Sequence, residues 1–446
     1  MNRPKAFPIL VALVALILVA IVVAAGWRLI GGSGDLLRKV TVSETRITPN
    51  ADGDNDIALF AYELARNATV SIYLTDAAGQ RFYFRQERPR GAGEYQVYFS
   101  GVVDGYSRPG EEVQGEILAR LLQDGEYTWV VEATDDNGQI QSVSGSLTIA
   151  QADIALPEMR NFTLDRARFS PNRDGIDDRV EAQFMLQKPA STRVFLLTPD
   201  GTELPIAEKD RGVALGEVGR HYFDYEGGVD NGATPPPDGT YTIVALAEDA
   251  EGQKMRVEAT LAIEYGGVPR AEIISPAVGD TLEFNTSSIV LCDTLYFTVT
   301  VHNYGDTPIR TTGPYPGTVY DSDWNATTLG WPTESGAWRL GIGFENALSD
   351  YPYRWSLGQP EELTEIDGHY YLMPGQRVVI TGGIRVVDLF GVRNPQPMWA
   401  GLIHEDVEIS QFNNRVDPHA ILVELPDPAA LPACEPREIP PFPAGS

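Results

Sequence analysis

The stretch ITPNADGDND, residues 47–56, occurs a second time as FSPNRDGIDD, residues 169–178. The same offset of 122 residues relates VSIYLTDAAG at 70–79 to TRVFLLTPDG at 192–201. Each of these later segments has the pattern of a strand that enters a turn at its glycine. Similarity that persists at one offset indicates two copies of a whole structural module.

Downstream, DGEYTWVVEA at 124–133 matches DGTYTIVALA at 238–247, and the offset has fallen to 114. Alternating strands at short spacing, without a βαβ pattern, predict two tandem antiparallel β-sandwiches at residues 40–150 and 158–265. The reduced offset places an insertion at 111–122 of the first copy. Its apolar residues follow helical spacing and predict a short amphipathic helix on the sandwich edge.

The pattern changes after residue 265. Strand-like runs continue through LYFTVTV at 295–301 and on to residue 425, and they predict a third sandwich at 268–425. A proline-rich tail follows at 426–446. The predicted fold is therefore mostly β, with three sandwiches in tandem.

The amino terminus contains 20 uncharged residues, FPILVALVALILVAIVVAAG at 7–26. As a helix this segment is long enough to cross a bilayer, so residues 1–30 predict a cytoplasmic tip and a transmembrane anchor. Arg3 and Lys5 precede it and place the amino terminus in the cytoplasm and the body outside. The predicted localisation is that of a single-pass cell-membrane protein. A cleaved signal peptide, with small residues at 23–25, is the alternative.

The charge is strongly acidic, with a net value of −28 and a pI near 4.5. Residues 1–39 carry +4, so residues 40–446 carry −32. A body this acidic repels phosphate backbones and excludes nucleic-acid binding. The five histidines are scattered, and the chain has no HExxH, GxSxG or GxxxxGK[ST] motif. We therefore predict that the protein is not an enzyme.

The chain has two cysteines, Cys292 and Cys434. Two thiolates are too few for a Cys-ligated zinc site or an iron–sulfur cluster. In an oxidising compartment the two could pair and attach the tail to the last domain. The alternative is a buried Cys292 and a free thiol in the tail.

The repeats resemble a known family. The motif Ser/Thr-Pro-Asn-x-Asp-Gly, followed by GVDNG at 228–232 and PDGTY at 237–241, resembles the Ig-like domain of the flagellar hook-capping protein and related modules of bacterial surface proteins. The resemblance covers residues 40–265, and the first copy departs from it after Gly105. It implies a non-catalytic sandwich that serves as spacer, adhesion or assembly module. The third domain resembles adhesion-type Ig-like surface modules at VTVHNYG, residues 299–305, and near its final strand.

The repeated turns are rich in oxygen ligands. Oxygen-bearing side chains at alternate positions have the spacing with which loops bind calcium, so calcium is the candidate cofactor. In the alternative interpretation the same side chains cap backbone N–H groups of a tight turn. The candidate metal ligands are Asn50, Asp52, Asp54, Asp56, Asn172, Asp174 and Asp178.

A long segment of the third domain, 313–358, is rich in glycine, tryptophan and tyrosine. Exposed rings on a β-sandwich can stack on sugars, whereas buried rings would form a small core beneath a long loop. The candidate ligand surface consists of Trp324, Trp331, Trp338 and Trp355.

Together these features predict a membrane-anchored extracytoplasmic structural or adhesion protein, in which two repeats form a stalk that presents a partner-binding domain. The expected partners are the membrane and an envelope protein or polysaccharide. Two alternatives remain open at this stage, a carbohydrate-binding protein of the cell envelope and an accessory subunit of a larger membrane complex.

Overall fold

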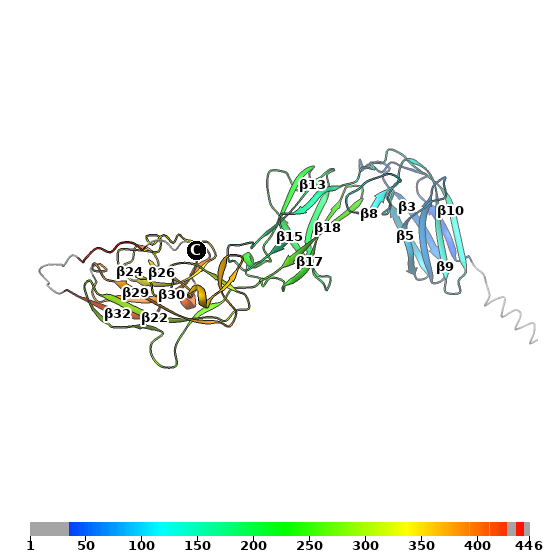
Figure 1. Cartoon of the computed structure of the whole chain (residues 1–446). Helices are drawn as coiled ribbons and strands as arrows, with labels where there is room; N and C mark the ends of the chain where they lie inside the picture. The colour runs from blue at the N-terminus through cyan, green and yellow to red at the C-terminus, as the bar shows by residue number, and fades with distance from the viewer. Residues whose placement is uncertain (1–34, 392, 410, 426–433, 441–446) are drawn as a thin grey trace, which may run out of the picture.

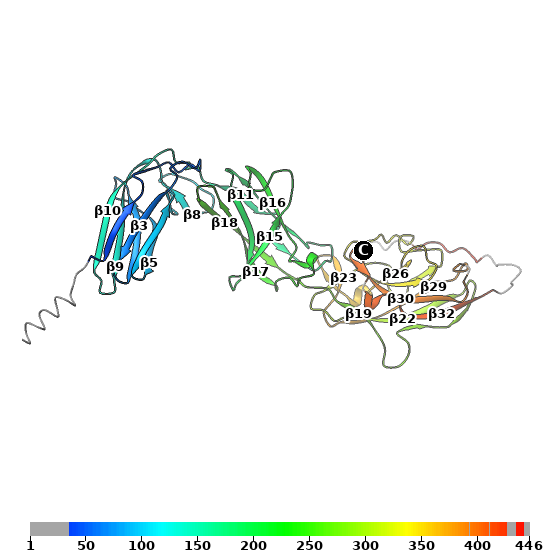
Figure 2. The same ribbon diagram turned by 180° about the vertical axis from the view of Figure 1, so that it is seen from behind.

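The computed structural model describes residues 35–391, 393–409, 411–425 and 434–440. Within them the chain forms 32 β-strands and three 3-10 helices of three residues each, which confirms the predicted mostly β class. Buried apolar side chains form three large clusters, one each within residues 36–149, 156–263 and 271–423. Figures 1 and 2 show the corresponding three bodies in a row.

The first repeat packs two sheets face to face. Its strands are β1 (Leu37–Val42), β2 (Arg46–Ile47), β3 (Ala58–Leu64), β4 (Ala68–Thr75), β5 (Arg81–Arg90), β6 (Gly93–Phe99), β7 (Val102–Asp104), β8 (Glu116–Leu121), β9 (Gly125–Asp135) and β10 (Ile140–Ile149). One sheet has the order β1-β3-β6 and the other β2-β10-β9-β4-β5. Every second residue of β3 is buried, and its Phe60 ring meets Trp129 of the opposite sheet at 5.7 Å between centroids.

The second repeat has the same arrangement of strands, except that one strand, β15, pairs with both of its layers. Its elements are β11 (Met159–Leu164), β12 (Arg168–Phe169), β13 (Val180–Leu186), β14 (Ser191–Leu197), β15 (Glu203–Glu208), β16 (Gly219–Tyr225), η1 (Val229–Asn231), β17 (Gly239–Glu248) and β18 (Lys254–Ile263). The order is β11-β13-β16-β15-β14-β17-β18. Strand β15 pairs with both β14 and β16, so the two layers join along this edge.

The third domain is larger. Its elements are β19 (Ala271–Ile274), β20 (Leu282–Phe284), β21 (Ser288–Val290), β22 (Thr294–Asn303), β23 (Ile309–Thr311), β24 (Val319–Asp321), β25 (Trp338–Phe344), β26 (Tyr353–Ser356), η2 (Pro360–Glu362), β27 (Thr364–Ile366), β28 (His369–Leu372), β29 (Arg377–Arg385), β30 (Gln396–His404), β31 (Glu408–Ile409), η3 (Gln411–Asn413) and β32 (Val416–Glu424). Its two sheets have the orders β19-β22-β29-β24 and β21-β32-β30-β25-β23-β28-β27. Each of the three bodies includes a parallel pair of strands, such as β2 with β10. The prediction of purely antiparallel sandwiches is therefore wrong in this detail.

The predicted helix at 111–122 is wrong. Residues 116–121 form β8, which pairs with β7 and also with β18 of the second repeat. A Cβ on Gly115 would lie 2.4 Å from the carbonyl oxygen of Arg256, so the two backbones touch at this point. Val113 and Ile117 pack against the core of the second repeat. Their spacing fits a helix, but pairing with a distant strand decides the conformation.

The predicted single-pass localisation needs correction. Among the residues that the structure describes, no helix is long and apolar enough to cross a membrane, because the helices found there are single 3-10 turns. Residues 7–26, on which the prediction rested, lie outside the described residues.

Candidate functional site

The first Asp-rich turn closes on its own backbone. The carboxylate of Asp56 accepts hydrogen bonds from the N–H groups of Asn50 and Gly53, at 3.1 and 2.8 Å. Asn50 Oδ1 accepts from the N–H of Asp52 at 3.1 Å, and Asp52 Oδ1 accepts from that of Asp54 at 2.9 Å. Gly53 has a φ of 88°, which glycine adopts without strain.

The second turn repeats these contacts. The carboxylate of Asp178 accepts from the N–H groups of Asn172 and Gly175, at 3.3 and 2.7 Å. Asn172 Oδ1 accepts from the N–H of Asp174 at 3.0 Å, and Asp174 Oδ1 accepts from that of Ile176 at 2.8 Å. The shared motif therefore encodes one capped turn, used twice.

Calcium takes about six to eight oxygen ligands. Four of the five candidate carboxylates accept backbone N–H groups, whereas the Asp54 carboxylate accepts from the side-chain amide of Asn55. Among the described residues, no group of three or more His, Cys, Asp or Glu side chains is placed to hold a metal ion. These contacts support the capped-turn interpretation, and a calcium site at the seven candidate ligands stays a prediction.

The second turn differs from the first in its surroundings, because it lies at the joint with the third domain. Asn172 and Asp174 are 2% and 5% exposed. The buried Arg310 guanidinium donates from Nε to the carbonyl of Asp174 at 2.7 Å and from Nη2 to that of Ser335 at 2.5 Å. Tyr371 donates its hydroxyl to the Asp174 carboxylate at 3.1 Å. Side chains of the third domain thus bind both backbone and carboxylate of the turn.

The two backbones also touch directly at this joint. A Cβ added to Gly175 would lie 2.2 Å from the carbonyl oxygen of Ser335, and one added to Gly336 would lie 2.1 Å from the carbonyl carbon of Asp174. Sequence reasoning missed the third-domain residues of this contact. The Arg310 to Asp174 bond spans 136 positions, and no local pattern marks such a pair.

His404 and Glu405 are both 3% exposed. Nε2 of His404 donates to the carbonyl of Arg173 at 2.7 Å, so this ring is a further contact of the joint. Burial lowers the pKa of His404 to about 4 and keeps it neutral. Glu405 pairs with the Arg339 and Arg354 guanidiniums, at 3.3 and 2.6 Å, beneath the third domain's surface.

Two carboxyl groups of the second turn, those of Asp174 and Asp178, have raised pKa values. Burial, and next the charge of Asp174, raises the pKa of Asp178 to about 6. Burial also raises the pKa of Asp174. A joint that excludes water disfavours charged groups, so it keeps the histidine neutral and makes the carboxyl groups harder to ionise.

The joint between the two repeats is held by pairing and by a buried amide. Gln253, which is 0% exposed, accepts from the N–H of Leu121 at 3.2 Å. Its Nε2 donates to the carbonyls of Asp153 and Ala155 in the linker, at 3.1 and 2.8 Å. Together with the pairing of β8 and β18, this amide fixes the linker against both repeats.

The predicted ligand surface of tryptophans is wrong for three of its four rings. Trp355, Trp338 and Trp331 are 0%, 4% and 5% exposed and belong to the core of the third domain. Trp324 is partly buried, and the Arg437 guanidinium lies over it at 5.7 Å from the ring centroid. Burying these large apolar rings stabilises the domain core, and the rings are then not available to stack on a ligand.

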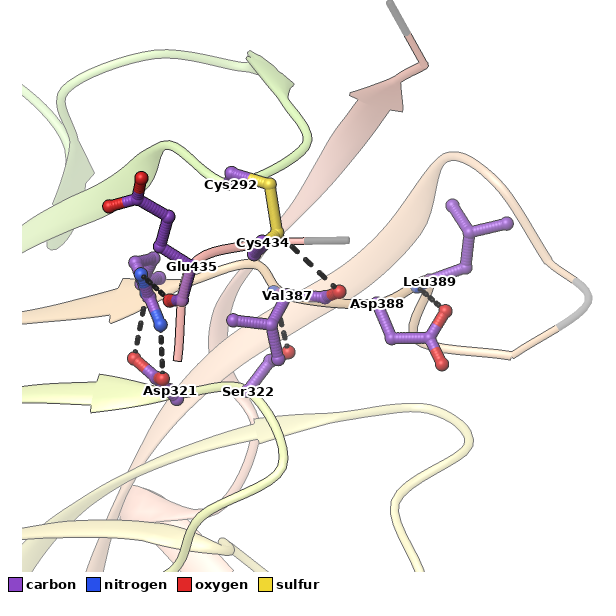
Figure 3. The surroundings of a disulfide bond; sticks show 9 residues. Cys292, Asp321, Ser322, Val387, Asp388, Leu389, Cys434 and Glu435 are labelled. Atoms are coloured by element: carbon purple, nitrogen blue, oxygen red, sulfur yellow. Dashed lines mark hydrogen bonds and ion pairs between the residues drawn. A yellow bond between two sulfur atoms is a disulfide. The ribbon is translucent and has the colours of Figure 1, made fainter. Parts of the chain in front are cut away.

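Cys292 and Cys434 form a disulfide, with their Cα atoms 5.5 Å apart. Figure 3 shows that the bond brings the segment after Cys434 against the strand ends of the third domain. There Arg385 donates to the carbonyl of Glu435 at 2.9 Å and forms an ion pair with Asp321 at 2.5 Å. The described part of the tail, 434–440, is therefore attached to the domain.

No family model matches this chain, and no curated protein does. The resemblance to the hook-capping domain consequently stays a prediction. Among solved structures, a calcium-stabilised adhesin that helps an Antarctic bacterium bind ice is 12% identical, over 78% of this chain and 73% of that chain, with a TM-score of 0.22. A tetra-tandem repeat from the extending region of a large adhesion protein is 12% identical, over 81% of each chain, with a TM-score of 0.17. At these TM-scores the matches carry no argument about this chain.

Proposed function

We propose that the protein is a non-catalytic, extracytoplasmic structural or adhesion protein in which the two repeats form a stiff spacer that carries the third domain. The observation that supports this best is the joint around Asp174, where side chains and backbone of the third domain enclose a turn of the second repeat. Domains of one chain move relative to one another unless their interface holds them together. Here the contacts are buried and specific.

Two further features support the proposal. The disulfide favours a location outside the cytoplasm, because such bonds persist in oxidising compartments. The pairing of β8 with β18 extends one sheet from the first repeat into the second, which resists bending at that joint. The partner that we propose for the third domain is an envelope protein or polysaccharide. The burial of the tryptophans removes the reason for placing a sugar on those rings.

The proposal is tested by measuring the distance between the second repeat and the third domain in the full chain. Fluorescent labels at the exposed positions Leu215 and Leu348 report this distance by single-molecule fluorescence resonance energy transfer. A stiff joint predicts one narrow distribution. A broad distribution in the unaltered chain would overturn the proposal.

A matched pair of glycine variants separates the joint from the turn. Gly175→Ala strains a positive φ and also places a methyl group against Ser335, so the distance distribution should broaden. Gly53→Ala imposes the same backbone strain at φ 88°, with no atom within 4 Å, and should leave the distribution unchanged.

A further inference from the structure

Strand β5, an edge strand of the first repeat, has a charge opposite to that of the chain. Residues 81–90 include four arginines and one glutamate, a net charge of +3 in a chain of net −28. Among the described residues, no ion pair joins any of the four arginines to a carboxylate. We call Arg81, Arg85, Arg88 and Arg90 the arginine edge.

Aromatic rings, not carboxylates, contact the guanidinium groups of Arg81, Arg85 and Arg90. The guanidinium of Arg81 lies over Tyr73 at 4.8 Å from the ring centroid, and that of Arg90 lies over Tyr95 at 5.3 Å. Every residue from Arg85 to Arg90 is exposed. A guanidinium that rests on a ring face keeps its N–H groups directed outward, where they can bind an anion.

The second repeat provides an internal comparison, since its β15 occupies the place of β5. The residues at the same offset, 203–212, have a net charge of −1. The cations there are paired, Lys209 with Asp224 at 3.3 Å and Arg211 with Glu181. Strand β15 pairs with strands on both sides, whereas β5 pairs with β4 and ends its sheet. The fold therefore needs neither the arginines nor the open edge.

From these contacts we infer that the arginine edge binds an anionic polysaccharide, a polymer of carboxylated or sulfated sugars. Guanidinium groups match such oxyanions with two parallel hydrogen bonds. Several cations along one extended strand suit a polymer with repeated charges better than a single small anion. The acidic remainder of the chain repels a polyanion at long range, but charges more than about 10 Å apart are largely screened at 0.1 M salt, so the local charge of +3 determines binding at this strand. The surface lies on the first repeat and is separate from the third domain, to which the proposed function assigns the partner.

An acidic peptide that adds a strand to β5 fits this edge less well. Pro89 has no N–H to donate, and Glu87 has a φ of 47°. The pairing of β4 with β5 shifts register on both sides of Ile72. Irregular edges of this kind hinder the addition of another strand.

The experiment measures binding of the full chain to immobilised polygalacturonate, with neutral dextran and poly-L-glutamate as the other two probes. Binding to polygalacturonate that weakens with salt is expected, with none to dextran. The double variant Arg85→Ser/Arg88→Ser should lose affinity about tenfold, since each exposed charge pair contributes modestly. The control variant Arg193→Ser/Arg211→Ser removes the same charge from the second repeat and should retain the affinity. If the double variant melts early, the single variant Arg88→Glu at an exposed position replaces it.

Three results would overturn the inference. One is equal binding to dextran and polygalacturonate, and another is an equal loss of affinity in the two double variants. The third is binding to poly-L-glutamate that depends on Arg85 and Arg88 without binding to polygalacturonate, which would assign the edge to an acidic protein.

Discussion

At the scale of single residues, Asp178 and His404 lie at one joint and respond to pH in opposite directions. Burial raises the pKa of Asp178 to about 6 from a usual 3.8, so the folded chain binds its proton more readily than the unfolded chain does. Stability from this group falls as pH rises from about 4 to 6. Burial lowers the pKa of His404 to about 4 from a usual 6.5. Stability from the imidazole rises as pH rises over the same interval.

Because the contributions of Asp178 and His404 to the pH dependence of stability have opposite signs, variants that remove one group at a time should reveal each contribution. Relative to the unaltered chain, Asp178→Asn should become more stable as pH rises from about 4 to 6, and His404→Gln should become less stable. Each pKa unit corresponds to about 1.4 kcal/mol, so the changes are on the order of 2 kcal/mol. Urea unfolding at several pH values in this interval measures them. Slopes of the same sign in the two variants would contradict the assignment.

The capped turns lead to a second residue-scale prediction. Since Asp56 and Asp178 accept backbone N–H groups, calcium added to chelator-treated protein should leave the melting temperature unchanged. Asp56→Ala should lower stability by about 1–2 kcal/mol with or without calcium, because it uncaps the turn. A rise in melting temperature with calcium that Asp56→Ala abolishes would restore the calcium hypothesis.

At the scale of elements, strand β8 joins the two repeats. Gly115→Ala places a methyl group against the carbonyl of Arg256 and strains a φ of 97°, so it should loosen the pairing with β18. Gly110→Ala, at a φ of 75° with no atom within 4 Å, is the matched control. We expect amide exchange of residues 254–256 to increase at least about tenfold in the first variant, which corresponds to about 1.4 kcal/mol, and to stay unchanged in the control. Equal exchange in both variants would show that the pairing does not hold the joint.

The elements also show what the sequence can and cannot predict. The repeated turn, the strands that flank it and the mostly β class follow from local patterns, because glycine, asparagine and aspartate determine turns over a few residues. Strand β8 does not, since Val113 and Ile117 pack on a core that belongs to the other repeat. The joint around Arg310 and Asp174 is equally hidden, because residues 136 positions apart meet only after both domains have folded.

At the scale of the whole molecule, three cores lie in a row and each joint uses a different device. The first extends a sheet across two domains, and the second encloses a turn of one domain in the next. Both joints restrict the relative motion of adjacent domains. A glycine-containing linker such as residues 264–269, EYGGVP, would otherwise allow that motion. The row in Figures 1 and 2 is therefore maintained by contacts that single substitutions can open.

Removal of the disulfide tests whether the three bodies unfold separately. Cys292 and Cys434 are 142 positions apart, so their bond closes most of the third domain into one loop and restricts its unfolded chain. Cys434→Ser should destabilise that domain by about 2–4 kcal/mol, a fall in melting temperature of roughly 5–15 °C. Calorimetry should show the third domain's transition moving down while those of the repeats stay in place, and Cys292→Ser/Cys434→Ser should behave like the single variant. A uniform shift of all transitions would instead mean that the joints couple the three domains into one cooperative unit, since loss of one bond would then destabilise the whole row.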